Sequence, residues 1–158
     1  MKDIEIRRAE QNDISDLSRM LYQVHKIHSD ARPDIFKPGS KKYTNFDLCK
    51  ILDDEKRPVF VAEWDGAVMG YAFCIHKEIK DNRSMSDIKT LYIDDLCVDE
   101  YGRGRHIGAA LYNFVIDYAK KNGYYNVTLN VWADNPNAVK FYEHMGLKVQ
   151  KIGMEKIL

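Results

Sequence analysis

The stretch Leu91-Tyr-Ile-Asp-Asp-Leu-Cys-Val-Asp-Glu-Tyr-Gly-Arg-Gly-Arg-His-Ile-Gly108 decides the fold of this 158-residue chain. Its first part, Leu91 to Val98, is apolar on both faces apart from two acids, which is typical of a central strand. Glycines and arginines follow, and from about Arg105 to Lys121 apolar residues recur at helical spacing. The sequence therefore predicts a central strand, a tight turn and an amphipathic helix in direct succession.

Further strands and helices extend from this unit in both directions. Strand-like patterns occupy residues 4–7, 59–62, 68–75 and 127–132, with a final strand or hairpin running to residue 158. Capping residues precede three more segments of helical spacing, at Asp13, Asn45 and Asn135. The order β-α-α-β-β-β-α-β-α-β predicts a single α/β (α+β) domain over residues 1–158, with a mixed sheet covered by helices.

Charge and composition argue against several classes of protein. Lys plus Arg and Asp plus Glu number 24 each, so the net charge is zero, whereas nucleic-acid-binding proteins usually carry a basic excess. The charged N-terminus is unlike a signal peptide, and no apolar run approaches the roughly 20 residues of a membrane span. Cys49, Cys74 and Cys97 are expected to be free core thiols in a reducing cytosol. We therefore expect a cytoplasmic protein that binds neither nucleic acid nor membrane.

The glycine-rich turn before the predicted helix suits a diphosphate. A helix N-terminus exposes unpaired backbone N–H groups and carries a partial positive charge. Gly102 and Gly104 let an anion approach the backbone closely, and Arg103 and Arg105 add positive charge. One alternative is a plain strand-to-helix turn with two solvated arginines. Another is a dinucleotide site, although the spacing is GxGxxxG rather than GxGxxG and the turn lies far from the first strand.

Two segments together resemble one family of enzymes. Arg103-Gly-Arg-His-Ile-Gly108 resembles motif A of the Gcn5-related N-acetyltransferases, Arg/Gln-x-x-Gly-x-Gly/Ala, with His106 where that motif usually has glycine. Asn135-Pro-Asn-Ala-Val-Lys-Phe-Tyr-Glu-His-Met-Gly-Leu147 resembles motif B, Asn-x-x-Ala-x-x-Phe/Leu-Tyr-x-x-x-Gly-Phe/Leu. His106 keeps its backbone N–H, and we expect helical dihedral angles there, so that the turn still accepts a diphosphate.

The resemblance covers nearly the whole chain and implies a mostly antiparallel central sheet flanked by about four helices. It implies an enzyme that transfers the acetyl group of acetyl-coenzyme A to a primary amine by direct attack in a ternary complex, without a metal, and it implies a homodimer. The backbone of Leu96, Cys97 and Val98 would pair with the pantetheine arm. The remaining residues implied to hold the cosubstrate are Arg103, Gly104, Arg105, His106, Ile107, Gly108, Ala109, Asn135 and Tyr142.

The chemistry of amide formation, read with this resemblance, assigns roles to Tyr142 and Asp94. Tyr142 carries a proton at neutral pH and lies at the tyrosine position of motif B, so it would protonate the departing thiolate. An alkylamine has a pKa near ~10 and must lose a proton before it attacks. The segment Tyr92–Val98 resembles a strand of spermidine/spermine acetyltransferases in which the acid matched by Asp94 is linked to that deprotonation, directly or through a water. Core packing of Tyr142 and a salt bridge of Asp94 are the alternatives.

The acceptor side of the site is less defined by the sequence. Strand alternation predicts that Asp94 and Asp95 point to opposite faces, with Asp95 as a cation-binding or structural acid. Tyr22, His28 and Arg32 are expected to contact the acceptor together with Asp95. A peptide N-terminus, a lysine side chain, a polyamine and a small amine all stay open as acceptors. The alternative to an enzyme is a non-catalytic domain that binds coenzyme A as a sensor or interaction module.

Overall fold

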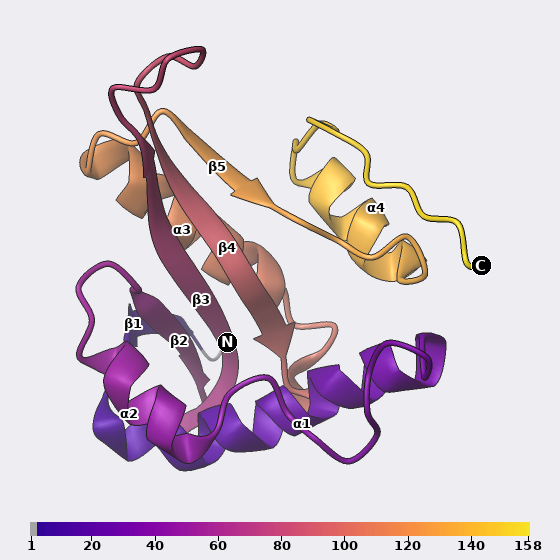
Figure 1. Ribbon diagram of the computed structural model, residues 1–158. Helices are drawn as coiled ribbons and strands as arrows, with labels where there is room; N and C mark the ends of the chain where they lie inside the picture. Colours follow the sequence, from indigo (N-terminus) through magenta and orange to yellow (C-terminus); the bar gives the residue numbers. More distant parts are fainter. Residues whose placement is uncertain (1–2) are drawn as a thin grey trace.

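The computed structural model describes residues 3–158 and contains one five-stranded sheet with four α-helices (Figure 1). The strands are β1 (Ile4–Arg8), β2 (Val59–Trp64), β3 (Ala67–Ile79), β4 (Ile88–Val98) and β5 (Asn126–Leu129). The α-helices are α1 (Ile14–Ala31), α2 (Asn45–Leu52), α3 (Ile107–Lys121) and α4 (Pro136–His144), and two 3-10 turns are η1 (Gln11–Asp13) and η2 (Glu100–Gly102). The strand order is β1-β2-β3-β4-β5, antiparallel except for the parallel pair β4–β5. This confirms the predicted mixed, mostly antiparallel sheet flanked by four helices.

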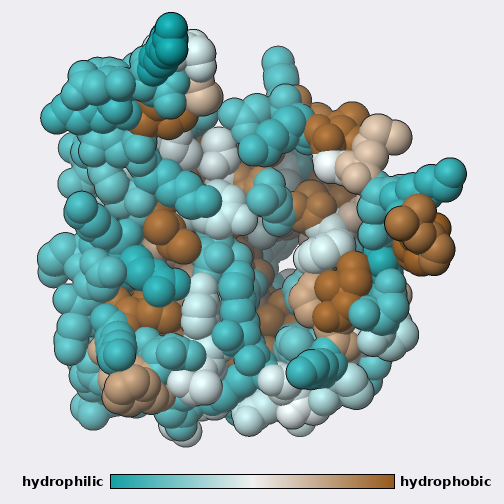
Figure 2. Space-filling model, viewed as in Figure 1, coloured by the Kyte–Doolittle hydropathy of each residue, from teal (hydrophilic) through white to brown (hydrophobic). Residues whose placement is uncertain are grey.

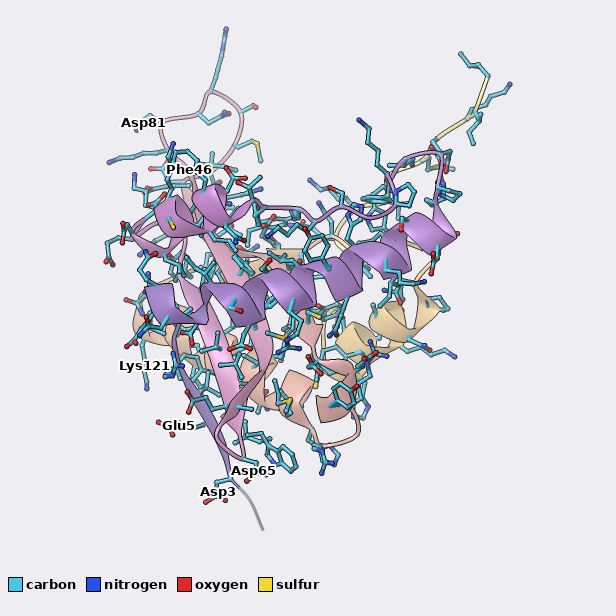
Figure 3. All side chains as sticks on the ribbon, turned by 90° about the horizontal axis from the view of Figure 1, so that it is seen from below. Asp3, Glu5, Phe46, Asp65, Asp81 and Lys121 are labelled. Carbon is cyan, nitrogen blue, oxygen red and sulfur yellow. The ribbon has the colours of Figure 1, made fainter. Side chains whose placement is uncertain are left out.

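Each face of the sheet has its own hydrophobic core. On one face, α1 and α2 pack through residues such as Leu17 and Leu48 against Tyr71 and Phe73 of β3. On the other face α3 packs against the sheet. Figure 3, seen from below, shows α1 running across the sheet strands. The two layers leave the C-terminal end of β4 between them, where the predicted turn begins.

A close approach of α3 to the sheet fixes the position of that turn. A Cβ atom at Gly70 of β3 would lie 2.9 Å from Cδ1 of Leu111 and 3.1 Å from the carbonyl oxygen of Cys97. A side chain at this position would therefore push α3 away from β3 and β4. Because glycine is present, the first turn of α3 rests directly beside the end of β4.

The β3–β4 pairing contains a bulge at the two acids. Phe73 pairs with Asp95 but the next residue, Cys74, pairs with Ile93, so Asp94 is an extra residue in β4. A bulge of this kind bends the strand and re-aims side chains. Strict alternation therefore does not hold across this point of β4.

The β4–β5 pairing ends before β4 does. It extends from Thr90 opposite Asn126 to Ile93 opposite Leu129, whereas β4 continues to Val98. Beyond this point the two strands diverge, as Figure 1 shows. The edge of β4 from Asp94 to Val98 that would face β5 consequently has no strand partner among residues 3–158.

The structure corrects several details of the sequence prediction. Thr44 rather than Asn45 caps α2, because the hydroxyl of Thr44 accepts from the N–H of Asp47. No strand forms near the C-terminus among the described residues: α4 ends at His144, Gly146 follows with a φ of +98°, and residues 148–158 are exposed. Residue 130 already lies outside β5. Asp13 precedes α1 without capping it, since its carboxylate binds Arg7 and the Glu10 N–H. Cys49 is exposed, although Cys74 and Cys97 are buried.

Among the described residues, no helix is long and apolar enough to cross a membrane.

Candidate active site

The predicted phosphate turn lies at the end of the open β4 edge. Residues 103–106 form an exposed turn, and α3 begins at Ile107. Gly104 has a φ of +77°, and open space surrounds the position of its missing Cβ. Gly108 in the first turn of α3 lies close to α4, because a Cβ there would lie 3.4 Å from Cζ of Phe141. Main-chain N–H groups at the start of α3 are thus presented in an open, glycine-lined turn.

His106 differs from expectation in its backbone conformation. It precedes α3 with φ +61° and ψ +21°, which is left-handed rather than helical. A non-glycine residue pays a steric cost there, because its Cβ crowds the following carbonyl oxygen. This explains physically why glycine is usual at this position of motif A.

We expect His106→Gly to raise the free energy of unfolding by about 0.5–1 kcal/mol, since relief of this crowding exceeds the added freedom of the unfolded chain. Urea denaturation followed by circular dichroism measures the change. His106→Ala serves as the control, because alanine keeps the Cβ and should bring no gain. Equal stabilisation by both substitutions would contradict the strain argument.

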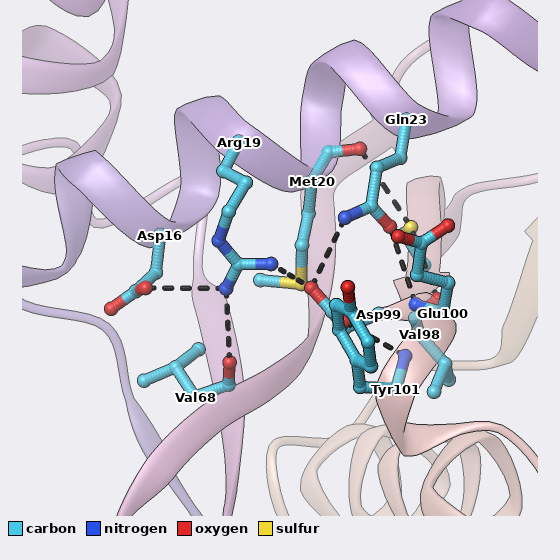
Figure 4. A network of polar contacts seen from close by, with 10 residues as sticks. Asp16, Arg19, Met20, Gln23, Val68, Val98, Asp99, Glu100 and Tyr101 are labelled. Atoms are coloured by element: carbon cyan, nitrogen blue, oxygen red, sulfur yellow. Dashed lines mark hydrogen bonds and ion pairs between the residues drawn. The ribbon is translucent and has the colours of Figure 1, made fainter.

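A buried carboxylate anchors the turn to α1 (Figure 4). Asp99 is 1% exposed and follows β4 directly. Its carboxylate pairs with Arg19 and accepts hydrogen bonds from Nε2 of Gln23 at 3.1 Å and from the N–H of Tyr101 at 2.9 Å. Gln23 also accepts from the N–H of Glu100 at 3.3 Å. The start of the turn is therefore bonded to two successive turns of α1.

We expect Asp99→Asn to lower the free energy of unfolding by about 2–3 kcal/mol, because a buried charged hydrogen-bond network loses its acceptor charge. Asp16→Asn is the matched control. Asp16 binds the same Arg19 at 3.2 Å, but its side chain is 42% exposed, so the change should stay within about 0.5 kcal/mol. Denaturant titration of both variants separates the two cases. A similar loss in both would mean that the ion pair with Arg19, not burial, sets the cost.

The bulge brings Asp94 and Asp95 to the same face of the sheet, which corrects the predicted opposite orientation. Asp94 accepts a hydrogen bond from Tyr43 and forms an ion pair with Lys42, both in the loop that precedes α2. Asp95 accepts from Oη of Tyr71 at 2.9 Å, and Tyr71 belongs to the core on the α1 side. The extra residue in β4 thus places two carboxylates side by side in a strand that otherwise alternates.

Both oxygens of Asp94 are engaged by protein groups. Oδ1 lies 2.9 Å from Nζ of Lys42, Oδ2 accepts from Tyr43, and Nη2 of Arg57 donates to Oη of Tyr43 at 2.9 Å. The side chain of Asp94 is 10% exposed. The pairing considered as the alternative for Asp94 is therefore present, and it holds the loop before α2 against β4.

Asp95 is the carboxylate with the more perturbed proton affinity. Burial raises the pKa of Asp95 to about 6, and the neighbouring charge of Asp94 also raises it, while the Tyr71 hydrogen bond and Lys42 lower it. A carboxylate with a pKa near 6 is ionised at neutral pH and still accepts a proton readily. Asp95 therefore has the properties of a general base.

Tyr142 lies on α4, across the opening from β4. Burial raises the pKa of its hydroxyl, and the nearby Asp95, Cys97 and Tyr112 raise it further, so the group is protonated at neutral pH. Among residues 3–158, no side chain bonds this hydroxyl. Figure 2 shows the surface hollowed between the end of β4 and α4. A proton donor and a proton acceptor thus border one opening.

The predicted acceptor residues divide into two groups. His28 and Arg32 line a small pocket with Trp132 and Asn135, and the ring of His28 stacks on Phe36 with centroids 5.1 Å apart. Burial lowers the pKa of His28, helped by His25 and Lys42. Tyr22 is 48% exposed with Lys41 over its ring and does not line this pocket.

Oδ1 of Asn135 accepts from the N–H of Ala138 at 3.3 Å, so its amide caps α4.

The sequence prediction did not include several residues of the site. Asp99 could have been recognised, because an acid directly after a strand and before a turn is a typical cap. Tyr43, Lys42 and Trp132 carry no local signal, since long-range packing brings them to the site. Within the described part of the chain, no group of three or more His, Cys, Asp or Glu side chains is arranged to hold a metal ion.

Comparisons with known proteins agree with this geometry. The sequence pattern of the acetyltransferase (GNAT) family matches residues 21–147. An uncharacterised N-acetyltransferase of Methanocaldococcus jannaschii is 27% identical over 96% of this chain, which spans 64% of that relative's length. The structure of a tetramutant of the BH1408 protein of Bacillus halodurans is 31% identical with a TM-score of 0.93, covering 98% of this chain and 99% of that one. An aminoglycoside N-acetyltransferase in complex with coenzyme A has the same fold at 14% identity, with a TM-score of 0.75 over 100% of this chain and 96% of its own.

Proposed function

This chain belongs to the acetyltransferase (GNAT) family of acetyl-CoA-dependent acyltransferases, and from this premise we propose that it transfers an acetyl group to a primary amine. The observation that carries the proposal is the unpaired edge of β4, which leads from Asp95 directly to the glycine-rich turn. Both features lie in one opening beside Tyr142. A thioester with an extended amide arm and a diphosphate fits this combination.

The open edge of β4 and the glycine-rich turn bind different parts of acetyl-coenzyme A. Main-chain groups of Leu96, Cys97 and Val98 on the open edge pair with the amides of the pantetheine arm in the manner of an added strand. The N–H groups from Gly104 to Ala109 bind the diphosphate, and Arg103 supplies positive charge. The structural relative that holds coenzyme A supports this assignment through its fold.

Asp95 and Tyr142 carry the proton transfers in the proposed reaction. Asp95 accepts a proton from the ammonium group of the acceptor, directly or through a water, and the amine nitrogen attacks the thioester carbon. A carbon–nitrogen bond forms, and a main-chain N–H of the open edge stabilises the oxyanion. The carbon–sulfur bond then breaks, and Tyr142 donates its proton to the departing thiolate. The nitrogen loses its second proton as the amide forms, and this proton returns Tyr142 to its neutral form, so that the product is the neutral amide with a free thiol. Asp94 has a positioning role, because its carboxylate is already bonded to Lys42 and Tyr43.

The acceptor is a primary amine that enters from the side of the small pocket lined by His28 and Arg32. Asp134 lines this pocket together with the rings of Phe36 and Trp132, which lie 5.2 Å apart. Carboxylates and aromatic faces both favour a cation. Small-molecule amines, polyamines and peptide or protein amines all satisfy this chemistry. A cytoplasmic location is part of the same proposal.

A panel of these amines incubated with acetyl-coenzyme A, with the release of free thiol as the readout, tests the function. We expect thiol release above the rate of spontaneous hydrolysis for at least one amine, together with the acetylated product by mass spectrometry. Equilibrium binding of acetyl-coenzyme A without turnover of any amine would instead identify a non-catalytic binding domain. Tight binding of NAD and none of acetyl-coenzyme A would overturn the assignment of the turn.

A further inference from the structure

A primary amine of the chain itself lies at the two carboxylates of β4. Nζ of Lys42, in the loop that precedes α2, is 2.9 Å from Oδ1 of Asp94 and 3.2 Å from the main-chain oxygen of the same residue. The side chain of Lys42 is 43% exposed, so its flexible stem is not fixed by packing in the core. An ammonium group thus already lies next to Asp95, the proposed base.

The thioester of bound acetyl-coenzyme A would lie beside this amine. In the proposed binding mode the diphosphate is at the glycine-rich turn, and the pantetheine arm follows the open edge of β4 from Val98 back to Leu96. The reacting end of the arm therefore points toward Asp95 and Asp94, just beyond the last residue of β4 that pairs with β5. Lys42 contacts the main chain of β4 at this same point.

The charge of Lys42 acts on two groups of the candidate site. It lowers the pKa of Asp95, and it also lowers the pKa of His28, which lines the small pocket proposed to admit the acceptor. The ammonium group is therefore close both to the proposed base and to the pocket from which an external amine would enter.

The neighbouring Lys41 is held in a different place. Its Nζ lies 2.5 Å from Oγ of Ser18 on α1 and 2.6 Å from Oδ1 of Asn45 on α2. Neither of these oxygens belongs to β4. Two adjacent lysines with the same chemistry thus differ in their position relative to the carboxylates of the site.

We propose that the chain acetylates its own Lys42, which is then an internal acceptor and a modification site. This inference rests on the proposed acetyltransferase function. Asp95 accepts a proton from the ammonium group of Lys42, and Nζ forms a bond to the thioester carbon. The carbon–sulfur bond breaks, Tyr142 protonates the thiolate, and the second proton lost by the nitrogen returns to Tyr142. The products are acetyl-lysine at position 42, free coenzyme A and one proton, which Asp95 releases to water.

Acetylation of Lys42 would change the electrostatics of the site. Acetyl-lysine carries no charge, so Asp94 would lose its ion pair and keep only the hydrogen bond from Tyr43. The pKa of Asp95 would rise, because a neighbouring positive charge that lowers it is removed. The modification therefore acts on the proposed base as well as on the loop before α2.

Incubation of the full chain with acetyl-coenzyme A and no added amine, followed by tandem mass spectrometry, tests the proposal. We expect Lys42 to be acetylated at least about 10²-fold faster than Lys41, because only Lys42 is positioned at the base and the thioester. Asp95→Asn should slow the acetylation of Lys42 by about 10²-fold. Lys41→Arg is the matched control and should leave the acetylation of Lys42 unchanged.

The release of free thiol in the same incubation gives a second readout. One equivalent of thiol per chain should appear in the wild-type protein and none in Lys42→Arg, which keeps the charge but offers no amine. The rate constant should not depend on protein concentration, because the amine and the thioester belong to one complex.

Three results would overturn the proposal. Equal acetylation of Lys41 and Lys42, or an unchanged rate at Lys42 in Asp95→Asn, would identify spontaneous acetylation. A rate constant that rises with protein concentration would mean that one copy modifies another. An unmodified Lys42 in a protein that acetylates an amine of the panel would overturn the internal acceptor and leave the proposed function intact, whereas no acetylation of either would overturn both.

Discussion

Replacing Asp95 by asparagine is expected to lower kcat/KM for amine acetylation by about 10²–10⁴-fold, because the amide cannot accept the proton of the attacking amine. The pH dependence of kcat/KM in the wild-type enzyme is the reference for this substitution. The pKa of Asp95 is raised to about 6, so kcat/KM should rise with pH through this value and the rise should vanish in Asp95→Asn. Thiol-release assays from pH 5 to pH 9 measure both effects.

Asp94→Asn is the matched control for this substitution. Asp94 is one of the charges that raise the pKa of Asp95, so its neutralisation should move the acidic limb of the profile to lower pH. The loss of kcat/KM at neutral pH should be smaller than in Asp95→Asn. The reverse result, with Asp94→Asn nearly inactive and Asp95→Asn active, would transfer the role of base to Asp94.

A stability measurement separates loss of the base from loss of the fold. Asp95 has a folded-state pKa above its ordinary value near 4, so its protonated form stabilises the folded state below that value, and this contribution is lost as the pH rises through about 6. Asparagine stays neutral. The free energy of unfolding of Asp95→Asn relative to wild type should therefore be more favourable at pH 8 than at pH 3, as measured by urea titration.

Replacing Tyr142 by phenylalanine is expected to lower kcat by about 10²-fold, because the departing thiolate loses its proton donor. The ring stays in place, and burial already keeps the hydroxyl protonated, so the affinity for acetyl-coenzyme A should change little. Stopped assays with a saturating amine give kcat, and calorimetry gives the affinity. The hydroxyl would lose its assigned role if acetylation continued at the wild-type rate.

Tyr112→Phe is a useful companion to Tyr142→Phe. Tyr112 lies on α3 and is close enough to Tyr142 to influence its pKa, but it is 6% exposed and belongs to the core cluster around α3. Removal of its hydroxyl should leave kcat within a few-fold of wild type. A comparable loss in both variants would indicate that packing around α4, not proton donation, limits the rate.

The sequence predicted the parts of this fold that local patterns determine. The apolar run of β4, the glycine-rich turn and the spacing of α3 follow each other directly, and each is recognisable without its neighbours in space. The candidate site was predictable to the same extent, because the turn and Tyr142 lie in two contiguous motifs. Asp95 was placed in the site, but its proton affinity depends on burial that only the folded chain provides.

The remaining features depend on contacts between distant segments. A register shift opposite Phe73 and Cys74 sets the orientation of Asp94 and Asp95, and nothing within residues 91–98 reveals it. The left-handed conformation of His106 is imposed by the geometry of entry into α3. The apolar pattern after Gly146 does resemble a strand, but a strand needs a neighbour, and its own sheet does not provide one.

The early end of the β4–β5 pairing has a thermodynamic consequence. An inner strand whose backbone groups face water instead of a neighbour is incomplete, and a molecule that satisfies those groups completes the sheet from outside. Such a molecule binds only the native chain, so at a concentration 100 times its dissociation constant it would raise the free energy of unfolding by about 2.7 kcal/mol. The melting temperature of this protein would then report binding at the open edge of β4, even before any acceptor is known.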